Sequence, residues 1–89
     1  MTYLVYCKDR KSVVNNLEHI IKEYKSNGIE CTCHRNFRDY IEIYFSNDDR
    51  WYGMYIPETL RGRAFDIIYT DDLKNYYSFL RPYQKDRND

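Results

Sequence analysis

Glycine is scarce in this chain of 89 residues, which has only three, at positions 28, 53 and 62. The phosphate-binding loop G-x-x-x-x-G-K-[ST] therefore does not occur, and with it goes the nest of backbone N–H groups that holds nucleotide phosphates. The two prolines and few glycines, with 43% hydrophobic and 31% charged residues, are typical of a globular chain and exclude a disordered one.

Long hydrophobic runs are also missing. No stretch reaches the roughly 18 apolar residues of a membrane helix, and no charged and apolar leader is visible. We therefore expect a cytoplasmic protein without a membrane segment, located in the host-cell cytoplasm if the gene is viral. The cysteine count is three, an odd number that fits reduced thiols in that compartment.

An excess of either charge is the third absence, because 14 basic residues balance 14 acidic ones. Nucleic-acid binding proteins usually carry a basic excess, since phosphate neutralisation supplies much of their affinity. The basic residues do gather in two places, around Arg10 and at Arg61 and Arg63. A local nucleic-acid patch therefore stays open as an alternative.

Tyrosine is the residue in excess, with 11 copies. Its ring can fill the shallow core of a small domain while its hydroxyl stays in water, and it is a preferred contact residue at protein interfaces. The run Trp51–Tyr55 contains three aromatic residues and follows Tyr44 closely. This region packs in the core or, where its outer face is exposed, can stack on bases or contact a protein.

The pattern of hydrophobic residues predicts one α/β domain over residues 1–83, with α+β as the alternative, followed by a polar disordered tail at 84–89. The expected order is β-α-β-β-β-β-α, a mixed sheet of four to five strands with two helices. The segments are strands at 2–7, 29–35, 40–46, 51–56 and 64–70, a helix at about 12–27 and a helix after Asp71.

The first helix has the clearest signals. Apolar residues recur at three- and four-residue spacing from Val13 to Tyr24, Asp9 or Ser12 can cap its start, and Gly28 suits a left-handed end. The buried-type strands 2–7 and 64–70 are expected to lie side by side and parallel, with this helix in the crossover. Their carboxyl ends would then share an edge, where α/β sheets usually bind ligands.

The segment Cys31-Thr32-Cys33-His34 could be taken for a zinc site, with Cys7 and His19 as further ligands. On a regular strand, however, the two cysteines face one side and His34 the other, so these three cannot share an ion without a bulge. Structural zinc also uses wider spacing within a cysteine pair and four ligands. We expect buried free thiols and no metal.

Residues 41–72 resemble part of the P-loop ATPase domain of phage large terminases and helicase-like proteins. In that family a strand ends in a polar turn, a Leu-Arg-Gly element follows, and an apolar strand then ends in two acids (the Walker B-like region). The matching pieces here are residues 41–47, 60–63 and 65–72, and the strand and helix at the start of the chain also look like their family counterparts.

The resemblance implies that Asp71 matches the acid that holds Mg²⁺ through water. The second acid of the family is a glutamate that polarises the attacking water, whereas this chain has Asp72, one methylene shorter. The missing phosphate loop is the larger departure, because positioning and charge neutralisation supply most of phosphoryl-transfer catalysis. Both acids also suit the cap of the last helix.

We therefore expect a small non-catalytic binding protein, encoded by a phage or mobile element, that acts as an inhibitor or accessory factor by contacting a host or viral protein. The predicted partner-contact residues are Arg61, Arg63, Tyr52, Tyr55 and Arg10. One alternative is a nucleic-acid-binding accessory protein that uses the local basic and aromatic patches. The other is a degenerate ATPase-like domain that binds Mg²⁺ or a nucleotide at Asp71 and Asp72; otherwise no cofactor is expected.

Overall fold

The computed structural model describes residues 1–71, 74 and 79–85, and its strands and one long helix follow the expected chain order. The elements are β1 (Thr2–Tyr6), α1 (Arg10–Ser26), β2 (Cys31–Asn36), β3 (Tyr40–Phe45), β4 (Arg50–Met54), a 3-10 helix (Pro57–Leu60), β5 (Ile67–Thr70) and a 3-10 helix (Arg81–Tyr83). The α/β prediction is thus confirmed at the level of a single small domain. No helix in the described part of the chain is long and apolar enough to cross a membrane.

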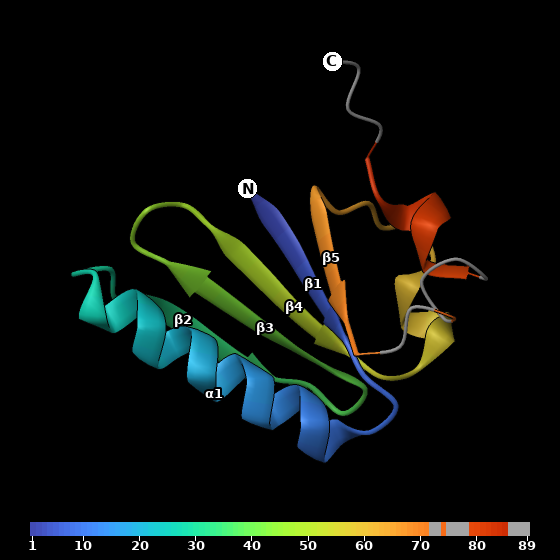
Figure 1. Cartoon of the computed structure of the whole chain (residues 1–89), viewed down its shortest axis with the longest axis horizontal. Coiled ribbons are helices and arrows are strands. Elements are labelled where there is room, and N and C mark those ends of the chain that lie inside the picture. The colour runs from blue at the N-terminus through green and yellow to red at the C-terminus, as the bar shows by residue number, and fades with distance from the viewer. Residues whose placement is uncertain (72–73, 75–78, 86–89) are drawn as a thin grey trace.

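All five strands form one mixed sheet in the order β2-β3-β4-β1-β5 (Figure 1). The β2–β3–β4 meander is antiparallel, and β1 runs parallel to both β4 and β5. The predicted parallel pairing of the two buried-type strands is therefore confirmed. Their connection is different from the prediction, because α1 leads from β1 to β2 at the far edge, and the chain reaches β5 only after the meander.

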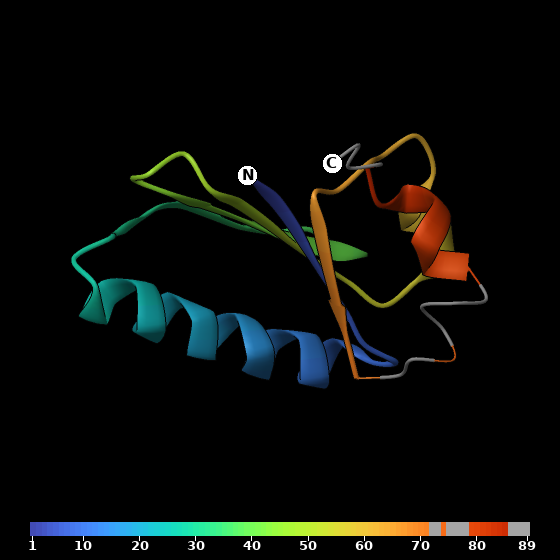
Figure 2. The ribbon, with the colours of Figure 1, turned by 45° about the horizontal axis from the view of Figure 1, so that its top comes forward.

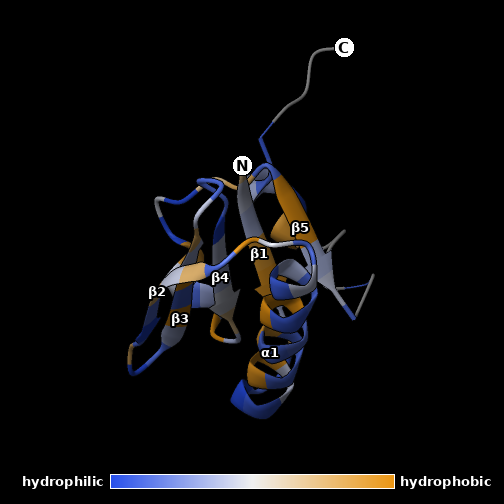
Figure 3. Ribbon diagram, turned by 90° about the vertical axis from the view of Figure 1, so that its left-hand side faces the viewer, coloured by the Kyte–Doolittle hydropathy of each residue, from blue (hydrophilic) through white to orange (hydrophobic). Residues whose placement is uncertain are grey.

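Helix α1 begins and ends as its sequence predicts. The Asp9 carboxylate accepts a hydrogen bond from the Ser12 backbone N–H at 2.8 Å, and Gly28 adopts a φ of 78° just after the last turn. Val13 and Leu17 are buried against the sheet. Figure 3 shows hydrophobic and hydrophilic residues alternating along the helix, which is the pattern of an amphipathic helix with one buried side.

Close packing of α1 on the sheet depends on Gly53 in the middle of β4. A Cβ atom at this position would overlap Val13 Cγ1 and lie 2.6 Å from Leu17 Cδ1. Glycine is therefore required here by the approach of the helix and not by its backbone angles. This contact fixes α1 over β4.

Figure 2 shows α1 on one face of the sheet and the segments after β4 and β5 on the other, and each face carries a hydrophobic core. On one face α1 packs against Ile41, Ile43 and Phe45 of β3, which confirms the predicted alternation along this strand. On the opposite face the segments that follow β4 and β5 bury Leu60 and Leu80 completely. We call this second surface the outer face of the sheet.

The strand predicted at 64–70 is too long, because β5 begins only at Ile67. Phe65 pairs instead with Gln84, donating its N–H to Tyr83 O and accepting from Lys85 N, each at 2.7 Å. Gln84 and Lys85, which the sequence assigns to the tail, thus contact the domain, and residues 86–89 lie outside the described part. The predicted second helix falls mostly on residues 72–73 and 75–78, also outside it.

Two further strand predictions need correction. The strand predicted at 51–56 ends at Met54, two residues before the expected stop, because Pro57 starts a 3-10 helix for which Ile56 is the N-cap. The strand predicted at 29–35 starts at Cys31. Ile29 belongs instead to the end of α1, since its N–H donates to Tyr24 O at 3.0 Å.

The predicted common face of Cys31 and Cys33 is also wrong. A register shift pairs Cys31 with Phe45 but Cys33 with Tyr44, and these two partners are neighbours on β3 that face opposite sides. His34 pairs with Ile43 and so lies on the α1 side. All three cysteines are free thiols, and only Cys7 is fully buried. Among the described residues no group of three His, Cys, Asp or Glu side chains could hold a metal ion.

Candidate functional site

A groove of about 510 Å³ lies on the α1 side of the sheet, between the helix and strands β1 and β5. It lies beside α1, which packs over β4 and β1, whereas β5 is the edge strand on the far side of β1. Its volume lies in the range of ligand pockets in proteins. The residues that line it are Tyr3, Val5, Cys7, Asn16, Ile20, Glu23, Tyr24, Trp51, Tyr69, Thr70 and Asp71.

Three aromatic rings from three adjacent strands form the floor of this groove. Tyr3 of β1 stacks on Trp51 of β4 with ring centroids 4.3 Å apart and an interplanar angle of 9°. Tyr69 of β5 lies 5.7 Å from the Trp51 ring at 11°. The rings are thus nearly parallel, and whereas Trp51 is 5% exposed, Tyr69 is 51% exposed. The groove therefore presents an aromatic surface whose buried part is fixed and whose outer part is open.

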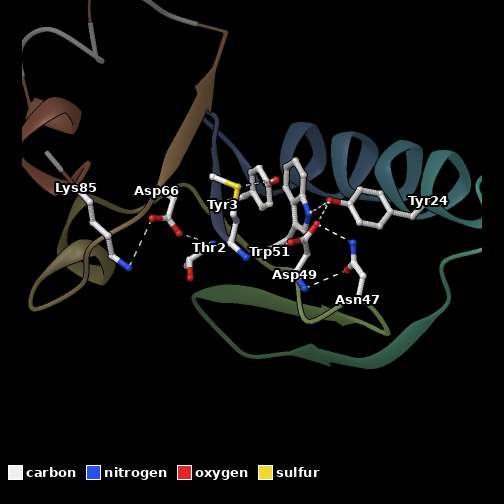
Figure 4. Close-up of polar contacts among 9 residues, drawn as sticks. Thr2, Tyr3, Tyr24, Asn47, Asp49, Trp51, Asp66 and Lys85 are labelled. Atoms are coloured by element: carbon white, nitrogen blue, oxygen red, sulfur yellow. Dashed lines mark hydrogen bonds and ion pairs between the residues drawn. The ribbon is translucent and has the colours of Figure 1, made fainter. Parts of the chain in front are cut away.

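A hydrogen-bond network holds Trp51 in place at one end of the groove (Figure 4). The indole Nε1–H donates to the Tyr24 hydroxyl at 3.1 Å, and this hydroxyl donates to Asp49 Oδ2 at 2.7 Å. Asp49 also accepts from Asn47 Nδ2 and from the amino group of Met1, each at 3.1 Å. The Trp51 ring is therefore oriented by groups from α1, the β3–β4 turn and the start of β1.

The pKa values in this network reflect its partly buried carboxylate, Asp49. Burial opposes the ionisation of Asp49, but hydrogen bonds from Tyr24, from the Met1 amino group and from Asn47 outweigh it and lower the pKa of the carboxyl. Burial, followed by the hydrogen bond to Asp49, raises the pKa of Tyr24 far above its ordinary value. Asp49 is thus ionised and Tyr24 is neutral at neutral pH.

The other end of the groove is polar and lies at the carboxyl ends of β1 and β5. Asp71 follows β5 directly, and Cys7 follows β1. Burial, with the nearby charges of Asp71 and Asp9, raises the pKa of the Cys7 thiol. Asn16 Nδ2 donates to its sulfur at 3.7 Å. A thiol in this setting stays protonated and is a weak nucleophile.

The carboxyl ends of β1 and β5 do share an edge, as predicted, but the groups at this edge differ from those of a phosphate site. The carboxylate of Asp9 occupies the start of α1 as its N-cap, where a phosphate would otherwise meet the helix N–H groups. Asp71 lines the groove. Asp72, its predicted companion, lies outside the described residues.

Two of the predicted partner-contact residues lie together on the α1 side. Arg10 Nη1 donates to Phe37 O, Arg38 O and the Tyr55 hydroxyl at 3.1 to 3.3 Å, and Tyr55 donates to Arg38 O at 3.1 Å. Both side chains therefore bind the β2–β3 turn to the body of the domain.

Two others lie together on the outer face. The Arg63 guanidinium is 5.3 Å from the Tyr52 ring centroid and 4.8 Å from that of Tyr40, and its Nε donates to Thr59 O at 3.2 Å. Arg61, the fifth predicted residue, is exposed in the loop just before Arg63. The five residues thus form two separate groups on opposite sides of the sheet.

Sequence reasoning missed most of the groove floor. Tyr3 and Tyr69 were assigned to buried strands, and Tyr24 to the apolar stripe of the helix. A usable signal was that Tyr3 and Val5 on β1, and Ile67 and Tyr69 on β5, occupy alternate positions of two strands expected to be parallel. Such positions share one face of the sheet.

No family model, curated protein or solved structure matches this chain.

Proposed function

We propose that the protein is a small binding protein whose partner is another protein, and that the partner contacts the groove between α1 and β5. The observation that carries this proposal is the half-exposed Tyr69 ring beside the nearly parallel rings of Trp51 and Tyr3. Tyrosine and tryptophan dominate the binding energy of protein interfaces when they lie in preformed hollows. In a phage or mobile element such a protein would act as an inhibitor or accessory factor.

The groove is also well organised before binding. Trp51 is held by Tyr24, and Tyr24 by Asp49, so two aromatic side chains have little rotamer freedom left to lose. Less ordering on binding means that more of the contact energy is available for affinity. The chemistry of the groove favours binding over catalysis, since its one thiol, Cys7, has a raised pKa.

The test is affinity capture with the native chain and with Tyr69→Ala from cells that make the protein, followed by reconstitution with the purified partner. We expect a stoichiometric complex that Tyr69→Ala weakens about 30-fold, the loss of a typical interface hot spot. Arg61→Ala is the control for a surface residue outside the groove. A partner that binds both variants as tightly as the native chain, or no protein partner at all, would contradict the proposal.

A second candidate function, nucleic-acid binding, is favoured by the outer face. There Arg50 lies 5.0 Å from the Tyr44 ring centroid, and Arg63 stacks on Tyr52. Arg35 on β2 is exposed. It lies in the same cross-strand row as Tyr52 of β4, with β3 between them. Arginine and aromatic side chains on a sheet are the groups that single-stranded nucleic acids bind, by phosphate contact and base stacking.

A mobility-shift assay with single-stranded oligonucleotides separates this candidate from the first. Binding through the outer face should weaken steeply with salt and should be lost in the double variant Arg61→Ala and Arg63→Ala. Tyr69→Ala, on the opposite side of the sheet, should leave it unchanged. Absence of a salt-dependent shift would remove the nucleic-acid candidate.

A further inference from the structure

The groove between α1 and β5 carries negative charge. Glu23 of α1 and Asp71 after β5 both line it and are exposed, and among the described residues that line it none is basic. The whole chain has a formal net charge of zero, so this imbalance is local. A partner group that enters the groove therefore meets carboxylates without a competing cation from the groove wall.

Negative charge also acts on titratable groups at both ends of the groove. The charges of Asp71 and Asp9 add to burial in raising the pKa of Cys7. The charge of Asp49 adds to burial in raising the pKa of Tyr3. Each end of the groove thus has a carboxylate nearby, Asp71 at one end and Asp49, paired with the Met1 amino group, at the other, and these carboxylates favour a cationic occupant.

The aromatic floor favours a cation as well. The faces of Trp and Tyr rings attract cations through the ring quadrupole, and Trp does so most strongly. Tyr3, Trp51 and Tyr69 stack on one another with interplanar angles of 9° to 18°, so the ring that stays open to a ligand is that of Tyr69 on the edge strand, which is 51% exposed. A planar cation can lie parallel to such a ring, whereas a compact ammonium gains less from it.

We propose that the groove binds an arginine side chain of the partner protein, with its guanidinium stacked on the exposed ring of Tyr69 and hydrogen-bonded to Asp71 or Glu23. This inference rests on the proposed function and names the chemistry of the partner. The chain already uses the same pairing within its own fold, where Arg63 stacks on Tyr40 and Tyr52 and Arg50 on Tyr44. A guanidinium also forms two parallel hydrogen bonds with one carboxylate.

The probe is the peptide acetyl-Gly-Arg-Gly-amide, titrated while the fluorescence of Trp51 is recorded. This is the only tryptophan in the chain, so the signal comes from the groove itself. The comparison peptides carry citrulline, which keeps the shape of arginine without its charge, or lysine. We expect the arginine peptide to bind about tenfold more tightly than the citrulline peptide and about threefold more tightly than the lysine peptide.

Three conservative variants test the assigned contacts. Asp71→Asn and Glu23→Gln remove charge at nearly constant shape, and Tyr69→Leu removes the exposed ring. The double variant Asp71→Asn and Glu23→Gln should weaken binding of the arginine peptide at least about fivefold. Tyr69→Leu alone should weaken it by at least the same factor. Glu18→Gln is the matched control, because Glu18 is an exposed carboxylate of the same helix that does not line this groove. Thermal unfolding of each variant shows that it is folded.

The outcomes separate this inference from the proposed function. Equal binding of the arginine and citrulline peptides, or unchanged binding in the charge variants, would overturn the arginine site. The proposed function would still stand if Tyr69→Ala weakened the reconstituted protein complex. A dimer of the chain alone that Tyr69→Leu abolishes in sedimentation would place a second copy in the groove and would also overturn the inference.

Discussion

Replacement of Gly53 by alanine tests the contact that places α1 over β4 and leaves the groove open. The new Cβ would overlap Val13 Cγ1 and lie 2.6 Å from Leu17 Cδ1, about 1 Å closer than ordinary van der Waals contact. The helix or its side chains must therefore move. Overpacking of this kind costs about 1–3 kcal/mol.

A smaller effect opposes this cost. Alanine restricts the unfolded chain more than glycine does, which stabilises a protein by about 0.4–1 kcal/mol where the backbone angles allow it. Gly53 has no positive φ, so this gain applies. From the middle of the two ranges we expect a net destabilisation of about 1 kcal/mol, which for a domain of this size lowers Tm by roughly 4–8 °C.

Chemical denaturation of four proteins measures this prediction: the native chain, Gly53→Ala, Val13→Ala and the double variant. Because Val13→Ala removes one of the two overlapping atoms, Gly53→Ala should cost at least about 0.5 kcal/mol less in that background. A neutral or stabilising Gly53→Ala, or strict additivity with Val13→Ala, would refute the close packing of α1 on β4.

Three further predictions follow from buried contacts. Tyr24→Phe should destabilise the fold by about 1–3 kcal/mol and shift Trp51 emission, because the indole N–H loses its acceptor, whereas Tyr55→Phe should leave this emission unchanged. Asp49 has a lowered pKa in the folded state, so its contribution is present above the ordinary value of 3.8 and is lost as pH falls through the folded value. Asp49→Asn should therefore be less stable than the native chain at neutral pH, with a difference in Tm that shrinks in acid; a constant difference would contradict this. Leu80→Ala should cost about 2–5 kcal/mol in urea denaturation, because Leu80 is 0% exposed, and a cost below about 0.5 kcal/mol would contradict its burial on the outer face.

The elements of this fold could be predicted because their signals are local. The spacing of Val13, Leu17 and Tyr24 marks α1, and strict alternation marks β3. The ends of strands were less predictable, since they depend on distant partners. Phe65 leaves the β5 pattern because its backbone pairs with residues 83–85, which no local window contains.

The candidate site was harder to predict than the fold. Asp71 was predicted as a ligand residue from the family resemblance and from its place at the carboxyl end of a strand, and it does line the groove. The predicted partner-contact arginines and tyrosines lie outside the groove. Arg10 holds the β2–β3 turn, and Arg63 stacks on a tyrosine ring of the outer face. The groove itself depends on how α1 lies across the sheet, and the close approach of Val13 and Leu17 to Gly53 contributes to this position.

Net charge was the least informative sequence property. A formal charge of zero gave no sign of an overall basic or acidic surface, yet charged side chains gather locally in the fold. Acidic Glu23 and Asp71 line the groove on the α1 side, whereas Arg50 and Arg63 lie on aromatic rings of the outer face. The groove thus combines carboxylates with aromatic rings, and the outer face combines arginines with aromatic rings next to the buried Glu42. The two proposed partners, an arginine-bearing protein and a nucleic acid, consequently require opposite faces of one sheet, and variants at Tyr69 and Arg63 can test them independently.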